Sequence, residues 1–192
     1  MAFGVSHVGR DRDDHMRSAG RLSVPVNSDD HRLGPEDAPI IVVEYGDYEC
    51  PYCGAAYPIV NEILRTFGRT LLFVFRNFPL EQVHPHAEAA AEVAEAVGVV
   101  GDFWAIHDTL FENQNALESD DLFRYASKVG VGVDELRREL NGRTPAMRVQ
   151  RDMEGALRSG VGGTPTFFVN GVRYDGSWDF EPFVAYLQSL AT

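Results

Sequence analysis

The chain contains two cysteines, Cys50 and Cys53, in the sequence Cys-Pro-Tyr-Cys. The apolar run at 40–45 before them predicts a buried strand, and the apolar spacing after them predicts an amphipathic helix. Free backbone N–H groups and the positive end of the dipole at the first turn of such a helix stabilise a thiolate, which lowers the pKa of the first cysteine. We therefore expect Cys50 to be a nucleophile, and Cys53, one turn further along, to resolve the mixed disulfide that it forms.

Two other roles of the cysteine pair are weaker interpretations. A structural disulfide across two intervening residues closes a very small loop, so it would stabilise the fold little. A zinc site would need a second pair of ligands, and the six histidines show no H-x₃₋₅-H spacing. The sequence thus favours a thiol-disulfide exchange centre and predicts no metal ligands.

Glu44 is a candidate proton acceptor, because it stands between apolar residues in the predicted strand six residues before Cys50. A buried carboxylate has a raised pKa, which suits proton exchange with a dithiol. The alternative is a solvent-facing glutamate. Tyr52 is difficult to bury between the cysteines, so we expect it to contact the substrate. His86 is expected to be a cap or surface residue rather than a catalyst.

Thr164 and Pro165 open a predicted strand after a glycine-rich turn. A cis bond between them would place the Thr164 backbone beside the cysteines, where it would pair with a substrate peptide. An ordinary trans proline at the start of a strand is an equally good interpretation of these residues alone.

The periodicity predicts an α/β chain with one inserted block. Alternation at Leu22, Val24 and Val26 predicts a first strand, and 27–39 is expected to be a turn-rich connection. Strands near 40–46, 70–76 and 166–169 flank a mainly helical stretch, and Asn170-Gly171 predicts a two-residue hairpin. We expect a poorly ordered arm at 1–20, an α/β frame at 21–79 and 143–192, and a helical lobe at 80–142.

Charge and hydropathy exclude several classes of partner. Seventeen basic and 29 acidic residues give a net charge of −12, which argues against nucleic acid and anionic membrane surfaces. No run approaches the roughly 18 apolar residues that a membrane span needs. Residues 1–39 contain no apolar h-region of about 7–15 residues, so we expect a cytoplasmic protein. A chain that lacked its leader would instead belong to the periplasm. The oligomeric state is not predicted.

Several motifs together resemble the DsbA-like thiol-disulfide oxidoreductases. The run at 43–53 is similar to their active-site segment, Pro58 to the proline inside their active-site helix, and 163–166 to their cis-proline loop. The resemblance covers about 35–191. It implies a thioredoxin-like fold, with a central mixed sheet flanked by helices and an inserted helical lobe.

For the site, the resemblance implies that Cys50 is the nucleophile, Cys53 the resolving thiol and Pro165 a cis proline. Thiol- or disulfide-containing proteins would be substrates, and Pro51, Tyr52, Thr164 and Pro165 would contact them. No cofactor is implied beyond the redox-active disulfide, and glutathione or a thioredoxin-system protein is the expected redox partner.

One departure from the family lies between the cysteines. Tyrosine replaces the histidine of the best-known DsbA-like dipeptide, and Pro-Tyr resembles glutaredoxins instead. We therefore expect a couple less oxidising than the roughly −120 mV of DsbA. Two alternatives stay open: a glutathione-linked transferase or isomerase on the same fold, in which one cysteine is dispensable, and a module that captures a soft metal.

Overall fold

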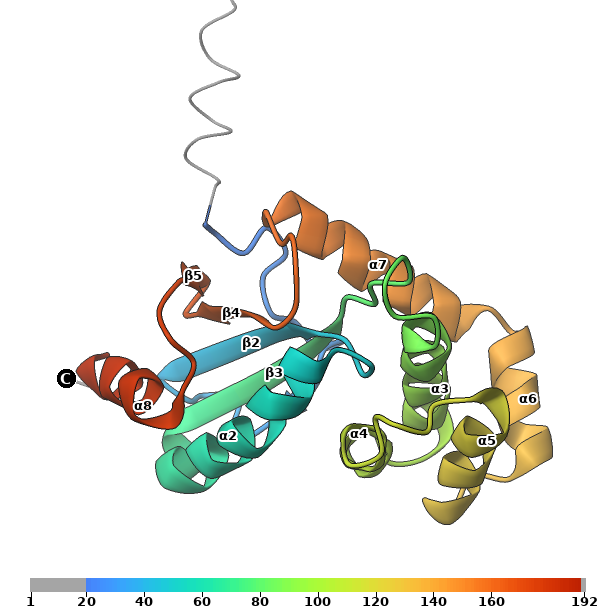
Figure 1. Cartoon of the computed structure of the whole chain (residues 1–192). Helices are drawn as coiled ribbons and strands as arrows, with labels where there is room; N and C mark the ends of the chain where they lie inside the picture. Colours follow the sequence, from blue (N-terminus) through green and yellow to red (C-terminus); the bar gives the residue numbers. More distant parts are fainter. Residues whose placement is uncertain (1–19, 191–192) are drawn as a thin grey trace, which may run out of the picture.

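The computed structural model of this chain describes residues 20–190 and contains a five-stranded mixed sheet (Figure 1). The strand order is β1-β3-β2-β4-β5. The central strands β2 and β3 are parallel and are connected through a helix, whereas every other neighbouring pair is antiparallel. The strands are β1 His31–Leu33, β2 Ile40–Gly46, β3 Leu71–Asn77, β4 Thr166–Val169 and β5 Val172–Tyr174.

Helices cover the sheet and extend beyond one end of it (Figure 1). The active-site helix α2 connects β2 to β3 through a short 3-10 turn, η1, and the last helix α8 packs beside α2. The bounds are α2 Pro51–Phe67, η1 Gly68–Thr70, α3 Ala87–Val100, α4 Phe103–Phe111, α5 Ser119–Lys128, α6 Val133–Asn141, α7 Thr144–Arg158 and α8 Phe180–Ser189. None of these helices is long and apolar enough to cross a bilayer, within the described part of the chain.

Alternation along β2 sends successive side chains to opposite faces of the sheet. Val42 packs in the core that includes α2 and α8, whereas Val43 and Tyr45 pack in a second core against α7. Glu44 shares the face of Val42, so its carboxyl group lies on the side of the sheet that carries the active-site helix. The alternation of side chains along the strand thus places Glu44 on the same side of the sheet as the cysteines of α2.

The helices α3 to α6 pack on one another beside the sheet (Figure 1). Their shared core contains fully covered leucine and isoleucine side chains, including Ile106, Leu110 and Leu136. Phe103 and Phe111 are buried and Trp104 is half-buried in this core. We propose that 80–142 is a lobe set into a frame formed by 21–79 and 143–192.

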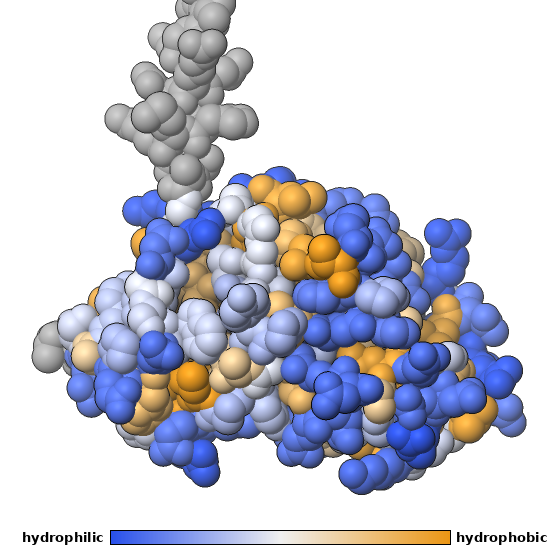
Figure 2. Space-filling view, viewed as in Figure 1, coloured by the Kyte–Doolittle hydropathy of each residue, from blue (hydrophilic) through white to orange (hydrophobic). Residues whose placement is uncertain are grey.

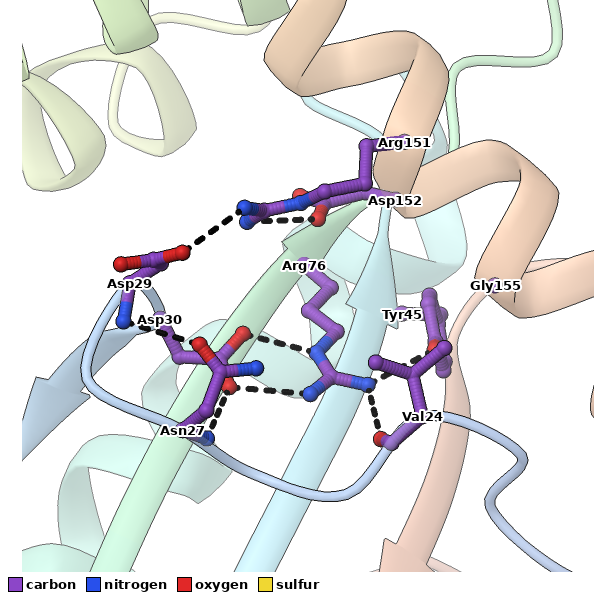
Figure 3. A pocket seen from close by; sticks show the side chains of 9 residues that line it. All are labelled: Val24, Asn27, Asp29, Asp30, Tyr45, Arg76, Arg151, Asp152 and Gly155. Carbon is purple, nitrogen blue, oxygen red and sulfur yellow. Dashed lines mark hydrogen bonds and ion pairs between the residues drawn. The ribbon is translucent and has the colours of Figure 1, made fainter.

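A buried arginine fixes the segment that precedes β1 to the sheet face covered by α7 (Figure 3). The guanidinium group of Arg76 donates two 2.9 Å hydrogen bonds to the carboxylate of Asp30. It also donates to the carbonyls of Val24 and Pro25 and to the hydroxyl of Tyr45. Because the Arg76 side chain is only 2% exposed, these acceptors replace the water that the cation has lost.

The predicted elements agree with the structure except near the N-terminus. The predicted strand at Leu22, Val24 and Val26 is wrong: Leu22 and Val26 instead pack against the α7-side core, and an isolated bridge from Arg21 to Val172 is the only strand pairing there. The connection predicted at 27–39 contains β1. Residues 1–19, where the poorly ordered arm is predicted, lie outside the described residues. The visible surface is mainly hydrophilic, with apolar patches among the polar side chains (Figure 2).

The remaining turns follow their sequence signals. Asn170 and Gly171 have φ angles of 48° and 78°, so this two-residue turn takes the left-handed backbone that joins β4 to β5. Gly68, with φ 50°, ends α2. The helix continues through Pro58, which has no N–H group to donate to the carbonyl of Gly54 one turn earlier.

Candidate active site

The two cysteines lie at the N-terminal end of α2, just after the carboxyl end of β2. Cys50 is the N-cap residue, with extended backbone at φ −71° and ψ 122°, and Pro51 is the first helical residue. Proline suits this position because its missing N–H group would have no partner within the helix. No side chain in the described part of the chain caps this end of α2, so the first-turn N–H groups are available to the sulfur of Cys50.

The surroundings of Cys50 favour its thiolate over its thiol. A hydrogen bond from the Cys53 thiol lowers the pKa of Cys50 to about 5, against the opposing effect of burial. The Thr164 side chain and the backbone N–H groups of Cys53 and Tyr52 lower this pKa further. The nucleophile predicted from the sequence therefore has the electrostatic environment that thiolate chemistry requires.

Cys53 has the opposite character. Its side chain is fully buried, and this burial, together with the neighbouring Cys50 and the charge of Glu44, raises the pKa of Cys53 well above its ordinary value. Cys53 therefore keeps its proton while Cys50 is ionised. The two sulfurs are thus divided into a ready nucleophile and a thiol that must first lose a proton.

Glu44 is buried on the same side of the sheet, with 3% of its surface exposed. Burial raises the pKa of Glu44 to about 8, and the negative charge of Cys50 raises it as well. The solvent-facing alternative for Glu44 is thus excluded. An acid of this pKa is mostly protonated at pH 7 but retains an accessible ionised form, and that form is the one that can accept a proton.

Glu44 lines a small cavity of about 60 Å³ between α2 and α4. Tyr57, Asn61, His107 and Asp108 are among the residues that line it. This volume is sufficient for a few water molecules. Burial lowers the pKa of His107 to about 3, so its ring is neutral and accepts or donates one hydrogen bond with the Tyr48 hydroxyl at 3.1 Å.

Thr164 and Pro165 lie beside the nucleophile, although 114 positions separate them from it in sequence. The Thr164–Pro165 peptide bond is cis. In its thiol form, Cys50 donates from Sγ to the Thr164 carbonyl at 3.4 Å. Among the described residues, the buried Thr164 hydroxyl has no partner other than the Cys50 sulfur, so it is free to donate to the thiolate. The loop predicted from the sequence is therefore in contact with Cys50.

Two histidine-carboxylate pairs hold the loop that enters α2. Asp47 is buried and accepts from Nδ1 of His84 at 2.8 Å, and Glu49 makes the same contact with His86. Both histidines belong to the segment that leads into α3. His86 is half-exposed, and its contact with Glu49 raises its pKa. The predicted surface position of His86 is consistent with this, but its contact with the active-site loop had no signal in the sequence.

Gln114 also contacts the active-site loop, and the sequence gives no sign of this contact. It lies in the turn after α4, and its side-chain amide donates to the carbonyl oxygens of Tyr48 and Cys50 at 2.8 and 2.9 Å. The sequence pattern indicated only that the helix ends near this position. Pro51 and Tyr52, by contrast, are exposed as expected, with Tyr52 66% exposed. Among the described residues, no group of three histidine, cysteine or acidic side chains is placed to hold a metal ion.

A thioredoxin family model matches residues 26–189. Among curated proteins, the Na(+)/H(+) antiporter NhaA 1 of Salinispora arenicola is 48% identical over 169 residues, which are 88% of this chain and 26% of that protein. NhaA 3 of Salinispora tropica is 46% identical over the same length and share. The chain spans about a quarter of the length of these curated relatives.

Solved structures share nearly the whole fold. Oxidised BdbD from Bacillus subtilis has a TM-score of 0.77 and 26% identity, and the match covers 90% of this chain and 98% of that one. A thioredoxin-like oxidoreductase from Silicibacter pomeroyi has a TM-score of 0.74 and 25% identity, over 86% and 91% of the two chains. The thiol-disulfide exchange protein α-DsbA2 from Wolbachia pipientis, at 17% identity, shares the fold with a TM-score of 0.76, over 96% of this chain and all of that one. These matches confirm the predicted thioredoxin-like fold and the resemblance to DsbA-like proteins.

Proposed function

Since the chain belongs to the thioredoxin family, we propose that it exchanges its Cys50–Cys53 dithiol and disulfide with thiols and disulfides of other proteins. One observation carries this proposal: the two sulfurs lie together at the free N-terminus of α2, with the pKa of Cys50 lowered to about 5 and that of Cys53 raised. Neither a metal-binding pair nor a structural disulfide requires two thiols with such different pKa values.

In the reducing direction, the Cys50 thiolate attacks one sulfur of a substrate disulfide. The substrate S–S bond breaks, the other substrate sulfur leaves as a thiolate, and a mixed disulfide joins Cys50 to the substrate. Cys53 then attacks Sγ of Cys50, which releases the second substrate thiolate and leaves the Cys50–Cys53 disulfide. Two electrons pass to the substrate, and the oxidising direction is the reverse of these steps.

Glu44 takes up the proton that Cys53 must lose before it attacks. Its pKa of about 8 supports this role, because an ionised and a protonated form are both accessible near neutral pH. The cavity between α2 and α4 gives the proton a path to solvent through water. When the reaction runs backwards, protonated Glu44 returns a proton to the Cys53 thiolate.

Substrate protein is proposed to lie across Pro51, Tyr52, Thr164 and Pro165. The exposed side chains of Pro51 and Tyr52 flank the largely covered sulfur of Cys50. On the other side, the Thr164 backbone lies at the end of the loop that leads into β4, where we propose that an extended substrate backbone pairs with it.

The decisive test is the substitution Cys50→Ser, assayed by reduction of insulin with glutathione as electron donor. We expect turnover to disappear, and we expect Cys53→Ala to retain the first attack while it loses disulfide turnover. If Cys50→Ser turned over insulin like the unmodified protein, the proposal would be wrong. If Cys53→Ala kept glutathione-dependent turnover, the glutathione-linked transferase or isomerase would be the better assignment.

The redox potential is proposed to lie between those of DsbA and thioredoxin. The Cys50 pKa of about 5 falls between about 3.5 in DsbA and about 7 in thioredoxin. The corresponding potentials are about −120 and −270 mV. Equilibration with glutathione measures this value directly. We propose a cytoplasmic location, in which glutathione or a thioredoxin-system protein restores the dithiol.

The curated relatives favour a second, wider role. Two proteins with the name of Na(+)/H(+) antiporters contain a segment 46–48% identical to this chain within a sequence about four times as long. We propose that this redox domain works in company with a membrane transporter. Co-expression with the remaining part of the Salinispora arenicola relative, followed by affinity purification, tests the association. Absence of co-purification would leave the dithiol chemistry standing and remove the transporter partner.

A further inference from the structure

The side chain of Gln114 connects the helical lobe to the nucleophile. It comes from the turn between α4 and α5, more than sixty positions after Cys50 in sequence. Its Nε2 group donates both of its hydrogens, one to the carbonyl of Tyr48 at 2.8 Å and one to the carbonyl of Cys50 at 2.9 Å. Along the chain, the Tyr48 carbonyl precedes the Cys50 N–H group and the Cys50 carbonyl follows it. Gln114 therefore holds the backbone on both sides of the Cys50 Cα atom, to which the nucleophilic side chain is attached.

The oxygen end of the same amide rests against Gly54 of α2. A Cβ atom added at Gly54 would meet Oε1 of Gln114 at 1.9 Å and Cδ at 2.7 Å. Gly54 has an ordinary helical backbone and is not among the glycines with positive φ. Alanine would be the better helix former there. The absence of a side chain at Gly54 is therefore explained by the space that Gln114 occupies.

The orientation of the Cys50 carbonyl matters because Cys50 caps α2. This carbonyl also accepts the first hydrogen bond of the helix, from the Gly54 N–H group at 3.0 Å. Its direction fixes the turn of backbone from which the Tyr52 and Cys53 N–H groups reach the sulfur. A second donor on the same carbonyl holds that direction when the substrate pulls on Sγ.

We propose that Gln114 is a positioning residue for the thiol exchange reaction, and that through it the helical lobe holds Cys50 in line with the first-turn N–H groups of α2. The inference rests on the proposed dithiol function. It assigns the lobe a part in the chemistry itself, in addition to any contact with substrate.

The first test replaces Gln114 by alanine, which removes both hydrogen bonds, and by glutamate, which keeps the shape but turns the donor into a charged acceptor. The pKa of Cys50 is read from the ultraviolet absorbance of the thiolate, and the redox equilibrium is measured with glutathione. We expect both variants to raise the pKa of Cys50 and to shift the equilibrium about tenfold toward the disulfide, equivalent to about 30 mV. Gln150→Glu on the exposed face of α7 makes the same change of charge and should leave both values unchanged.

Gly54→Ala tests the same contact from the opposite side. The added methyl group must displace the Gln114 amide, so this variant should also raise the pKa of Cys50. In a Gln114→Ala background the same substitution has nothing to displace and should add no further shift. A non-additive double-mutant cycle separates this contact from a general effect on α2. If Gln114→Ala fails to fold, Gln114→Ser, which also empties the space beside Gly54, takes its place in the cycle.

The outcomes separate this inference from the function on which it rests. A folded Gln114→Ala or Gly54→Ala protein with the unmodified pKa and the unmodified glutathione equilibrium would overturn the positioning role while the dithiol function stands. If the unmodified protein itself shows no equilibrium with glutathione and no insulin turnover, the proposed function fails first.

Discussion

Glu44→Gln is expected to stabilise the reduced protein at neutral pH. Burial raises the pKa of Glu44 from 4.5 to about 8, so the folded state holds a proton that the unfolded chain releases. A buried acid with a raised pKa lowers the free energy of unfolding. This loss is absent below pH 4.5, grows as the pH rises and levels off near pH 8. At pH 7 the 2.5 pH units above the unfolded pKa, at about 1.36 kcal/mol each, amount to about 3 kcal/mol.

The assay is urea unfolding of the reduced protein between about pH 5 and pH 9, because the slope of the free energy of unfolding with pH counts the protons involved. Comparison of the Gln variant with the unmodified chain isolates the contribution of Glu44, which includes the effect of the Cys50 charge on its pKa. The difference should increase from near zero at the acid end to about 3 kcal/mol at neutral pH. Glu181→Gln, an exposed position on α8, is the matched control and should follow the unmodified protein. A difference that does not vary with pH would refute the burial argument for Glu44.

Three further predictions concern the site and the buried arginine. Cys53→Ala should accumulate the mixed disulfide with substrate, visible as a conjugate on gels without reductant. Thr164→Val should raise the pKa of Cys50, because the Thr164 side chain lowers it; an unchanged thiolate titration would contradict this. Asp30→Asn should cost about 3 kcal/mol in denaturant unfolding near neutral pH, because it leaves the buried Arg76 without its carboxylate. Burial raises the pKa of Asp30, but the hydrogen bond and charge of Arg76 outweigh this and hold the pKa below its ordinary value of 3.8. The stability difference between Asp30→Asn and the unmodified protein should therefore fade as the pH falls through this lowered pKa.

The centre of the site could be predicted because its signals are local. Cys50 and Cys53 stand between a strand and a helix whose patterns are unambiguous, and the structure places them at the free end of that helix. Glu44 was readable as a candidate because a charged residue in a buried strand is unusual. Its exposure and its face, however, depend on packing against α2, which no local pattern contains. The Thr164 loop needed the family resemblance, since the residues alone left cis and trans equal.

The residues that sequence reasoning missed have partners far away in the chain. Gln114 lies 64 positions from Cys50, and its turn reads as an ordinary helix end until the lobe folds back on α2. His84 and His86 likewise acquire their meaning from Asp47 and Glu49, 37 positions earlier. The error at Leu22–Val26 has a related cause. Apolar alternation there reflects packing against the α7-side core, and the pattern of such a packed extended segment is the same as that of an edge strand.

The opposite faces of β2 restrict the kinds of genetic change that the chain can accept. Glu44 points toward the cysteines and Tyr45 toward Arg76, so two adjacent residues lie on opposite faces of the sheet and belong to different sites. Insertion or deletion of one codon within β2 would exchange these directions for every residue beyond it. The acid would then lie beside the arginine cluster and the phenol beneath the helix. Length variation among natural homologues should therefore gather in the connections and spare this strand, while point substitutions on either face remain free to accumulate independently.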